Sequence, residues 1–234
     1  AQFIAIFGRG GNYKSAVGAL AAAAGVIFGF FKNKTLKNVG DALVGFGLML
    51  SGLSALSGRI NALKSYDFLS GFAYVDNPFL LFLFGAAVAA VTQSSSAITG
   101  ILVTFSENSF AAFYRAIFII TGSNVGSCAA VILSSANKSE PAREAAVFNF
   151  VFNAFGAILF LPILVAAKNF LPVIFPHSAT DAGRAMADFH TVFNLLSSLA
   201  AFPLLKFLCG VTRKLVAGQK RATCRKFSKN KKTA

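Results

Sequence analysis

The chain has 234 residues, of which 56% are hydrophobic and 13% are charged, and its mean hydropathy is +0.66. A soluble domain carries roughly twice that share of charged residues, so the composition excludes an ordinary soluble protein and predicts an all-α polytopic membrane protein. The net charge of +14 does not indicate nucleic-acid binding, because nine of the basic residues follow Thr212 in an acid-free tail without an aromatic-interleaved basic module.

Several apolar runs approach or reach the roughly 17 to 25 residues that a membrane-spanning helix needs. In chain order the expected spans are Ser15–Phe31, Val39–Leu56, Ala111–Leu133, Ala145–Ala167 and Ala185–Cys209. The first two are joined by a basic loop with Lys32, Lys34 and Lys37, and a polar segment over Ser57–Asn77 follows the second. The second span contains glycines that would let neighbouring backbones approach closely, namely Gly40, Gly45, Gly47 and Gly52.

The uncharged stretch Pro78–Ser106 has two possible structures, one long bent span or two half-helices that meet at Gln93–Ser96. Cytoplasmic loops of membrane proteins carry an excess of basic residues. Two half-helices forming a re-entrant hairpin would put both the Lys32–Lys37 loop and the basic tail, Arg213–Lys232, in the cytoplasm, where the tail would lie against anionic lipid. We therefore expect a multi-pass protein of the plasma membrane with a re-entrant hairpin and a cytoplasmic tail.

Two polar clusters interrupt the apolar sequence. The first is Thr92-Gln93-Ser94-Ser95-Ser96, and the second is Thr121-Gly122-Ser123-Asn124-Val125-Gly126-Ser127. Because unpaired polar groups in hydrocarbon cost several kcal/mol each, such clusters face protein, water or a ligand. Hydroxyls and amides at the ends of broken helices suit both an oxyanion and a cation, so we predict one shared ion site, with helix breaks at Gly122 and Gly126.

Charge balance suggests how an anion could enter such a site. Between Pro78 and Ser135 the one cationic side chain is Arg115. An uncompensated anion in a low-dielectric interior is very costly, so a co-bound cation is expected to enter with it. The hypothesis is therefore that the protein couples anion transport to a cation and is not a simple anion channel. An anion affinity that does not depend on sodium would contradict it.

Enzyme and metal-site interpretations find little support. Ser94–Ser96 lack a surrounding G-x-S-x-G and have no Lys or His close in sequence to act as a base. The cysteines at 128, 209 and 224 share no metal-ligand spacing and are interpreted as packing or bystander thiols. We expect no enzyme activity, no cofactor, and no metal other than transported sodium.

The two clusters resemble the QSSS and G-(A/S)-N-I-G-T elements of the type II sodium/phosphate cotransporter family, in the same order and with fitting spacing. Arg143 with Phe152-Asn153 resembles the family's R-x-x-A-x-x-H-x-x-F-N element, and His190-Thr191-Val192-Phe193-Asn194 resembles its H-T-x-F-N element. Gly40–Leu53 is similar to the glycine-rich helix that opens the second repeat. Two positions depart from the pattern, because Asn149 replaces a usual His and Ser127 a usual Thr.

The resemblance implies a sodium-coupled phosphate symporter built from inverted repeats. By this resemblance Gln93, Ser94, Ser95 and Ser96 would contact phosphate and sodium with Thr92 flanking, while Thr121, Ser123, Asn124 and Ser127 would form the opposite wall. The alternative for these hydroxyls is capping of their own helices. Asn153, Asn194 and His190 are expected to be interhelical hydrogen-bond partners and not ligands.

This chain contains one QSSS, whereas the family carries two. Its first residues, Ala1–Ala5, resemble the sequence that follows the first repeat's broken helix. The expected organisation is residues 1–38 as the end of the first repeat, 39–211 as the second repeat, and 212–234 as the tail. A truncated gene, a fragment lacking the first repeat, and a half-transporter pairing with a second copy are all open. Open alternatives in function are a sodium-coupled dicarboxylate or sulfate transporter and a phosphate-sensing membrane subunit.

Overall fold

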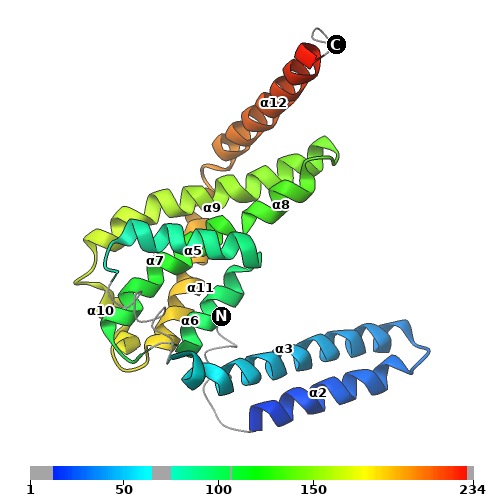
Figure 1. Cartoon of the computed structure of the whole chain (residues 1–234), viewed down its shortest axis with the longest axis vertical. Coiled ribbons are helices and arrows are strands. Elements are labelled where there is room, and N and C mark those ends of the chain that lie inside the picture. Colours follow the sequence, from blue (N-terminus) through cyan, green and yellow to red (C-terminus); the bar gives the residue numbers. More distant parts are fainter. Residues whose placement is uncertain (1–12, 65–74, 106, 231–234) are drawn as a thin grey trace.

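A computed structural model describes residues 13–64, 75–105 and 107–230, and these residues form helices and no strands (Figure 1). In chain order the helices are α2 (Tyr13–Gly29), α3 (Lys34–Lys64), α5 (Pro78–Thr92), α6 (Ser95–Phe105), α7 (Phe110–Gly126), α8 (Cys128–Ser135), α9 (Glu140–Ala166), α10 (Leu171–Ile174), the 3₁₀ helix η1 (Pro176–Ser178), α11 (Ala182–Ala201) and α12 (Leu205–Asn230). The all-α prediction is confirmed for this part of the chain. Ala1–Ala5 and residues 65–74 of the predicted polar segment lie outside it.

Two of the described helical segments are long and apolar enough to cross a membrane, Phe110–Ser135 and Glu140–Ala166. These two candidate spans coincide with the spans predicted at Ala111–Leu133 and Ala145–Ala167. Two further candidates are bent pairs, α5 with α6 at 117° and α11 with the first part of α12 at 90°.

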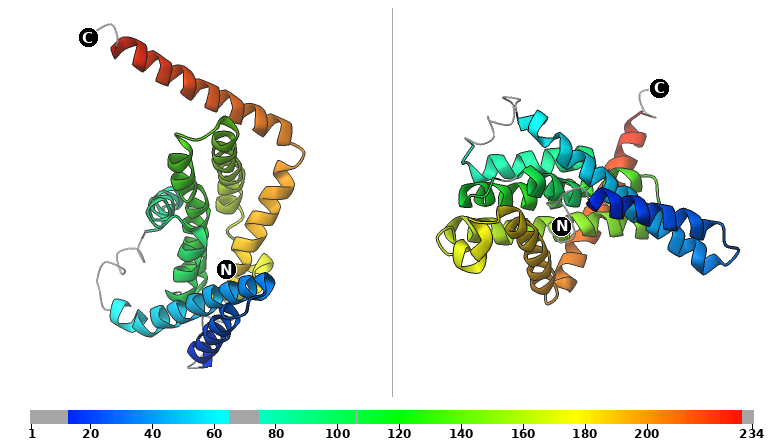
Figure 2. Two further views of the ribbon diagram at one scale, coloured as in Figure 1. Left: turned by 90° about the vertical axis from the view of Figure 1, so that its right-hand side faces the viewer. Right: turned by 90° about the horizontal axis from the view of Figure 1, so that it is seen from below.

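The bend between α11 and α12 corrects the prediction of one continuous span over Ala185–Cys209. Helix α11 ends at Ala201 and α12 begins at Leu205, with Pro203 between them. Proline has no N–H to donate, and its ring clashes with the carbonyl one turn earlier. The tail predicted for residues 212–234 begins inside α12, which continues as a helix to Asn230 and turns sharply away from α11 (Figure 2).

Helices α2 and α3 form a hairpin that projects from the other helices (Figure 1). Their backbones meet at two glycine pairs, because a Cβ on Gly25 would lie 2.5 Å from the Gly40 oxygen and one on Gly47 would lie 2.5 Å from the Gly18 oxygen. The packing role predicted for Gly40 and Gly47 is therefore confirmed. It is wrong for Gly45 and Gly52, where a Cβ would meet no atom within 4 Å.

The basic loop predicted between the first two spans is shorter than expected. The side chain of Asn33 accepts a hydrogen bond from the Thr35 N–H at 2.9 Å, and α3 already begins at Lys34. The side-chain oxygen satisfies one of the free N–H groups of the first turn. Helix α3 then continues through the expected Val39–Leu56 span and into the predicted polar segment as far as Lys64.

Helices α5 and α7 pack with their backbones in contact. A Cβ added to Gly122 would overlap the Phe82 carbonyl oxygen, and one added to Gly126 would overlap the Ala86 oxygen one turn further along. From the first contact to the second, the position increases by four residues on α7 and by four residues on α5. The two helices therefore run in the same direction. Gly85 makes a third such contact, with the Ile119 oxygen. Close backbone approach at small residues is a common way for membrane helices to associate.

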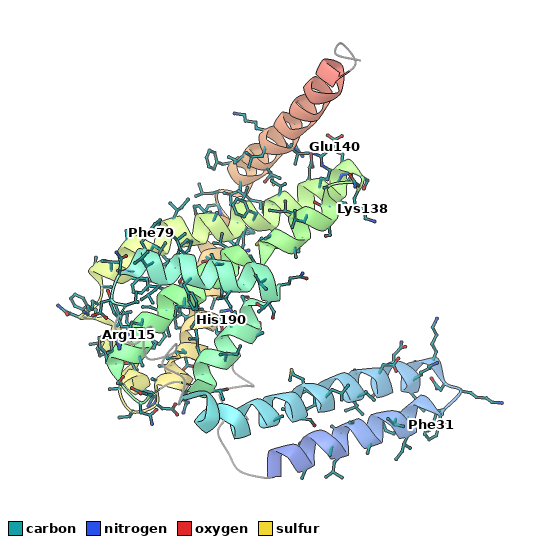
Figure 3. All side chains as sticks on the ribbon, in the orientation of Figure 1. Phe31, Phe79, Arg115, Lys138, Glu140 and His190 are labelled. Carbon is teal, nitrogen blue, oxygen red and sulfur yellow. The ribbon has the colours of Figure 1, made fainter. Side chains whose placement is uncertain are left out.

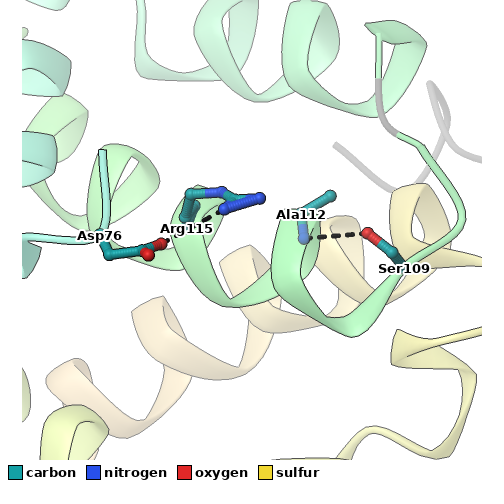
Figure 4. Close-up of polar contacts among 4 residues, drawn as sticks. All are labelled: Asp76, Ser109, Ala112 and Arg115. Carbon is teal, nitrogen blue, oxygen red and sulfur yellow. Dashed lines mark hydrogen bonds and ion pairs between the residues drawn. The ribbon is translucent and has the colours of Figure 1, made fainter. Parts of the chain in front are cut away.

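Polar contacts secure the beginnings of α5 and α7 (Figure 4). The Arg115 guanidinium on α7 pairs with the Asp76 carboxylate just before α5 at 3.3 Å. The Asn77 side chain accepts from the Phe79 and Leu80 N–H groups, and the Ser109 hydroxyl accepts from the Ala112 N–H. These caps explain why both helices begin where they do.

Aromatic side chains fill the core between α7, α9 and α11. Phe113 on α7 lies 5.4 Å, centroid to centroid, from Phe175, and Phe193 on α11 lies 5.5 Å from Phe160 on α9. A second apolar cluster joins the first half of α12 to α9.

Candidate functional site

The chain breaks at Gln93, as predicted for the Gln93–Ser96 segment. Helix α5 ends at Thr92, and Gln93 has φ 59° and ψ 19°, the one positive φ outside glycine in the described part of the chain. Left-handed backbone at a residue other than glycine costs of order 1–3 kcal/mol and is enriched at functional sites. Helix α6 starts again at Ser95, with the Ser94 hydroxyl accepting from the Ala97 N–H at 3.2 Å.

The polar groups at this break face outward with few partners. Gln93 and Ser96 are exposed, and Ser95 is half-buried. The Thr92 hydroxyl donates to the Val88 oxygen of its own helix at 3.0 Å. Among the described residues, the side chains of Gln93, Ser95 and Ser96 make no hydrogen bond, so their donors are free for a ligand.

The predicted opposite wall lies on α7 and is mostly buried. Thr121 and Ser123 are fully buried, and their hydroxyls donate to the oxygens of Ile117 at 2.7 Å and Ile120 at 2.8 Å. The half-buried Ser127 hydroxyl donates to the Asn124 oxygen at 3.0 Å. These three hydroxyls therefore bond within their own helix, as the capping alternative expects, and each keeps an oxygen lone pair that could contact a cation.

Asn124 differs from its neighbours. Asn124 as a whole is 3% exposed, and its amide nitrogen is buried without a hydrogen-bond partner. A buried donor left unpaired costs about 1–3 kcal/mol. Such a group needs an acceptor that the described residues do not supply.

Gly122 lies inside α7 and does not break it, which corrects the prediction for Gly122, whereas Gly126 is the last residue of α7. Helix α7 runs without interruption from Phe110 to Gly126, and Ser127, the one residue before α8, has nearly helical angles of φ −61° and ψ −18°. The glycines serve instead as the contact surface for α5. A glycine permits both a break and a close approach, and the neighbouring helix decides which one occurs.

The structure brings the two clusters onto packed helices but does not join them directly. Ala86, which touches Gly126, precedes Thr92 by six residues, or about 9 Å of helix. Helix α6 returns from the break and packs against α7 and α11. In the described chain, no hydrogen bond connects Gln93–Ser96 with Thr121–Ser127.

A polar cluster around Cys128 connects this wall to α9. The buried thiol donates to the Asn124 oxygen at 3.4 Å and accepts from the amides of Asn149 at 3.5 Å and Asn153 at 3.4 Å. Sequence reasoning missed this role, although the four-residue spacings Asn124–Cys128 and Asn149–Asn153 indicate one shared face on each helix. The interhelical role expected for Asn153 is confirmed. The interhelical role expected for Asn194 is wrong, because the Asn194 amide donates to the His190 backbone oxygen in its own helix.

A pocket of about 280 Å³ lies elsewhere, and none of the predicted site residues lines it. Its lining comes from the region of α10, η1 and α11 and includes His177, Asp188 and Thr191. No cluster of three or more His, Cys, Asp or Glu side chains that could hold a metal ion occurs in the described residues.

The distribution of charge along the helices defines the class of protein. Arg115 lies at one end of the α7–α9 region and Lys138 and Glu140 at the other, while Phe79 projects outward (Figure 3). Large apolar side chains between these ends face away from the protein, with Leu133 76% and Ile158 75% exposed. Outward-facing apolar surface on long apolar helices defines an integral membrane protein.

The family follows from comparison with known proteins. The family described as Na+/Pi-cotransporter matches residues 67–201. The chain belongs to this family. No solved structure matches it.

Two curated relatives extend the comparison. "Uncharacterized protein YqeW" of Bacillus subtilis is 30% identical over 184 residues, which cover 77% of this chain and 58% of YqeW. "Putative inorganic phosphate export protein YjbB" of Salmonella typhimurium is 23% identical over 196 residues, covering 82% of this chain and 35% of YjbB. The chain thus spans about half of YqeW and a third of YjbB.

Proposed function

We propose that the protein to which this chain belongs is a sodium-coupled symporter of inorganic phosphate. The observation that carries the proposal is the strained break at Gln93, where two apolar helices expose free hydroxyl and amide donors. Family membership and the phosphate named for the relative YjbB support the choice of substrate.

In the proposed mechanism, phosphate oxygens accept hydrogen bonds from the side chains at the break. Gln93, Ser95 and Ser96 are the free donors, and the first N–H groups of α6 add the partial positive charge of a helix N-terminus. Sodium is proposed to bind the hydroxyl oxygens of Thr121, Ser123 and Ser127. These hydroxyls donate their protons within their own helix and keep a lone pair for a cation. The site requires further donors, which we assign to a second QSSS tip in a first repeat or in a second copy.

Charge compensation favours sodium coupling. Arg115, the one basic side chain between Pro78 and Ser135, is already paired with the Asp76 carboxylate, and its own side chain is 23% exposed at a helix end. It is therefore poorly suited to neutralise an anion at the break. Since an unpaired anion in a low-dielectric site is very costly, co-bound sodium ions are proposed to supply the positive charge.

We expect radiolabelled phosphate to accumulate in proteoliposomes containing the full-length protein when a sodium gradient is applied, and not under an equal potassium gradient. Excess sulfate or a dicarboxylate should leave uptake unchanged. Loading the vesicles and reversing the gradient measures export, the direction named for YjbB.

The double variant Ser95→Ala/Ser96→Ala should lose uptake. The control variant Ser134→Ala should keep it, because the Ser134 hydroxyl donates within its own helix. Sodium-independent uptake would refute the coupling.

We also propose that α5 and α6 form a re-entrant pair that enters and leaves on one side of the membrane. Their 15 and 11 residues reach only about 22 and 16 Å at 1.5 Å per residue, less than the roughly 30 Å hydrocarbon core. Single cysteines replacing the exposed Asp76 and Asn108, in a chain whose native cysteines are changed to serine, should therefore react with an impermeant thiol reagent from the same side. Labelling from opposite sides would establish a full crossing.

A further inference from the structure

Helix α12 combines a docked face and an exposed basic face. Its buried side chains Leu208, Thr212 and Val216 recur every four residues, and the two apolar ones pack in a cluster with Val147 and Val151 of α9. This stripe fixes which way the described part of α12 faces. The opposite side of α12 packs against no other described helix and is exposed.

The uncovered side is basic. Lys206, Arg213 and Lys214 are exposed, and at about 100° per residue they fall on one face, away from the docked stripe. No carboxylate among the described residues pairs with them. The sequence of α12 contains no Asp or Glu, and five more basic residues follow before the helix ends at Asn230.

Apolar side chains border this basic face. Phe202 is 79% exposed at the bend, Phe207 is 65% exposed and Leu215 is 46% exposed. Exposed phenylalanine and leucine beside lysine and arginine suit the boundary between acyl chains and headgroups. The 90° bend turns α12 away from the direction of α11, as a helix lying along the membrane surface requires.

We propose that α12 is an interfacial helix that binds anionic lipid headgroups through Lys206, Arg213 and Lys214. Charge complementarity selects this partner, because the helix carries many positive charges and no negative ones. Each basic side chain near an anionic membrane surface contributes roughly a fivefold factor in affinity, and this attraction is screened by salt. The helix thereby anchors α9, on which it docks, to one face of the membrane.

The chain has no tryptophan, so one introduced at exposed Ala217 reports on α12 alone. We expect Ala217→Trp in phosphatidylcholine bilayers to be quenched more strongly by brominated phosphatidylglycerol than by the same fraction of brominated phosphatidylcholine. The triple variant Lys206→Gln/Arg213→Gln/Lys214→Gln should reduce that difference, because five basic residues of α12 remain, and high salt should remove it. Its docked stripe is untouched, and circular dichroism checks that it remains folded.

The matched control is Lys32→Gln/Lys34→Gln/Lys37→Gln, which removes the same charge from exposed residues at the α2–α3 turn. It should retain the preference for phosphatidylglycerol. Equal quenching by the two brominated lipids overturns the proposal. The partner of the basic face would then be an acidic protein and not a lipid. Equal loss in both triple variants also overturns it, because the preference then follows overall charge and not α12.

Discussion

Replacing Gly122 by valine is expected to abolish the folded α5–α7 pair. Even a Cβ at this position would overlap the Phe82 carbonyl oxygen, and a backbone atom cannot move aside as the end of a side chain can. The two helices would have to separate, losing the contacts at Gly85 and Gly126 as well. We expect no monodisperse protein after detergent extraction, and no phosphate uptake.

The smaller variant Gly122→Ala tests the same contact with the least added volume, because it adds only the Cβ. Overpacking at a close contact costs about 1–3 kcal/mol, whereas alanine favours a helix over glycine by about 1 kcal/mol. Gly122→Ala should therefore lower the thermal unfolding midpoint. Gly45→Ala, where a Cβ meets open space, should leave it unchanged or raise it. A higher midpoint in Gly122→Ala, as in Gly45→Ala, would mean that α5 and α7 lie too far apart for the Gly122–Phe82 contact.

Asn124→Leu is expected to weaken phosphate uptake strongly while leaving the fold as stable as before, or more stable. The amide nitrogen of Asn124 is buried without a partner, so its replacement by an apolar side chain of similar size removes a penalty of about 1–3 kcal/mol. If that amide contacts the ion in the proposed site, the half-saturating phosphate concentration should rise about 10- to 100-fold. Thermal unfolding and initial uptake rates measure the two effects separately.

Asn153→Leu is the matched control for Asn124→Leu. The Asn153 amide has partners, donating to the Cys128 sulfur and to the Asn149 oxygen, so its removal should destabilise the protein by about 1 kcal/mol. A loss of stability in Asn124→Leu as large as that in Asn153→Leu would show that the Asn124 amide has a structural partner. Normal uptake by a stable Asn124→Leu protein would remove Asn124 from the proposed site.

The break at Gln93 could be predicted because its signal is local. Five consecutive polar residues within an apolar run resist a continuous helix in lipid, and Ser94 is a suitable residue to cap the next helix. The bend after α11 also has a local signal in Pro203, but the apolar composition around it favoured a continuous span. Hydropathy averages over a window, whereas a helix break depends on single residues.

The role of Gly122 could not be predicted from its own segment. Glycine within a polar run is compatible with a hinge, and only the carbonyl of Phe82, forty residues earlier, makes it a packing position. The role of Cys128 could not be predicted from its own segment either, because its partners Asn149 and Asn153 lie on another helix.

The sequence by itself determined the membrane class, the two long spans, the family resemblance and the position of the polar break. These depend on residue type and spacing along the chain, since transfer into lipid and helix capping act over one or two turns. Only the tertiary structure decided that the α7 glycines contact α5, that Cys128 joins α8 to α9, and that the Asn124 amide has no partner. Each of these depends on which remote backbone or side chain lies within a few ångströms, and that follows from packing of the whole bundle.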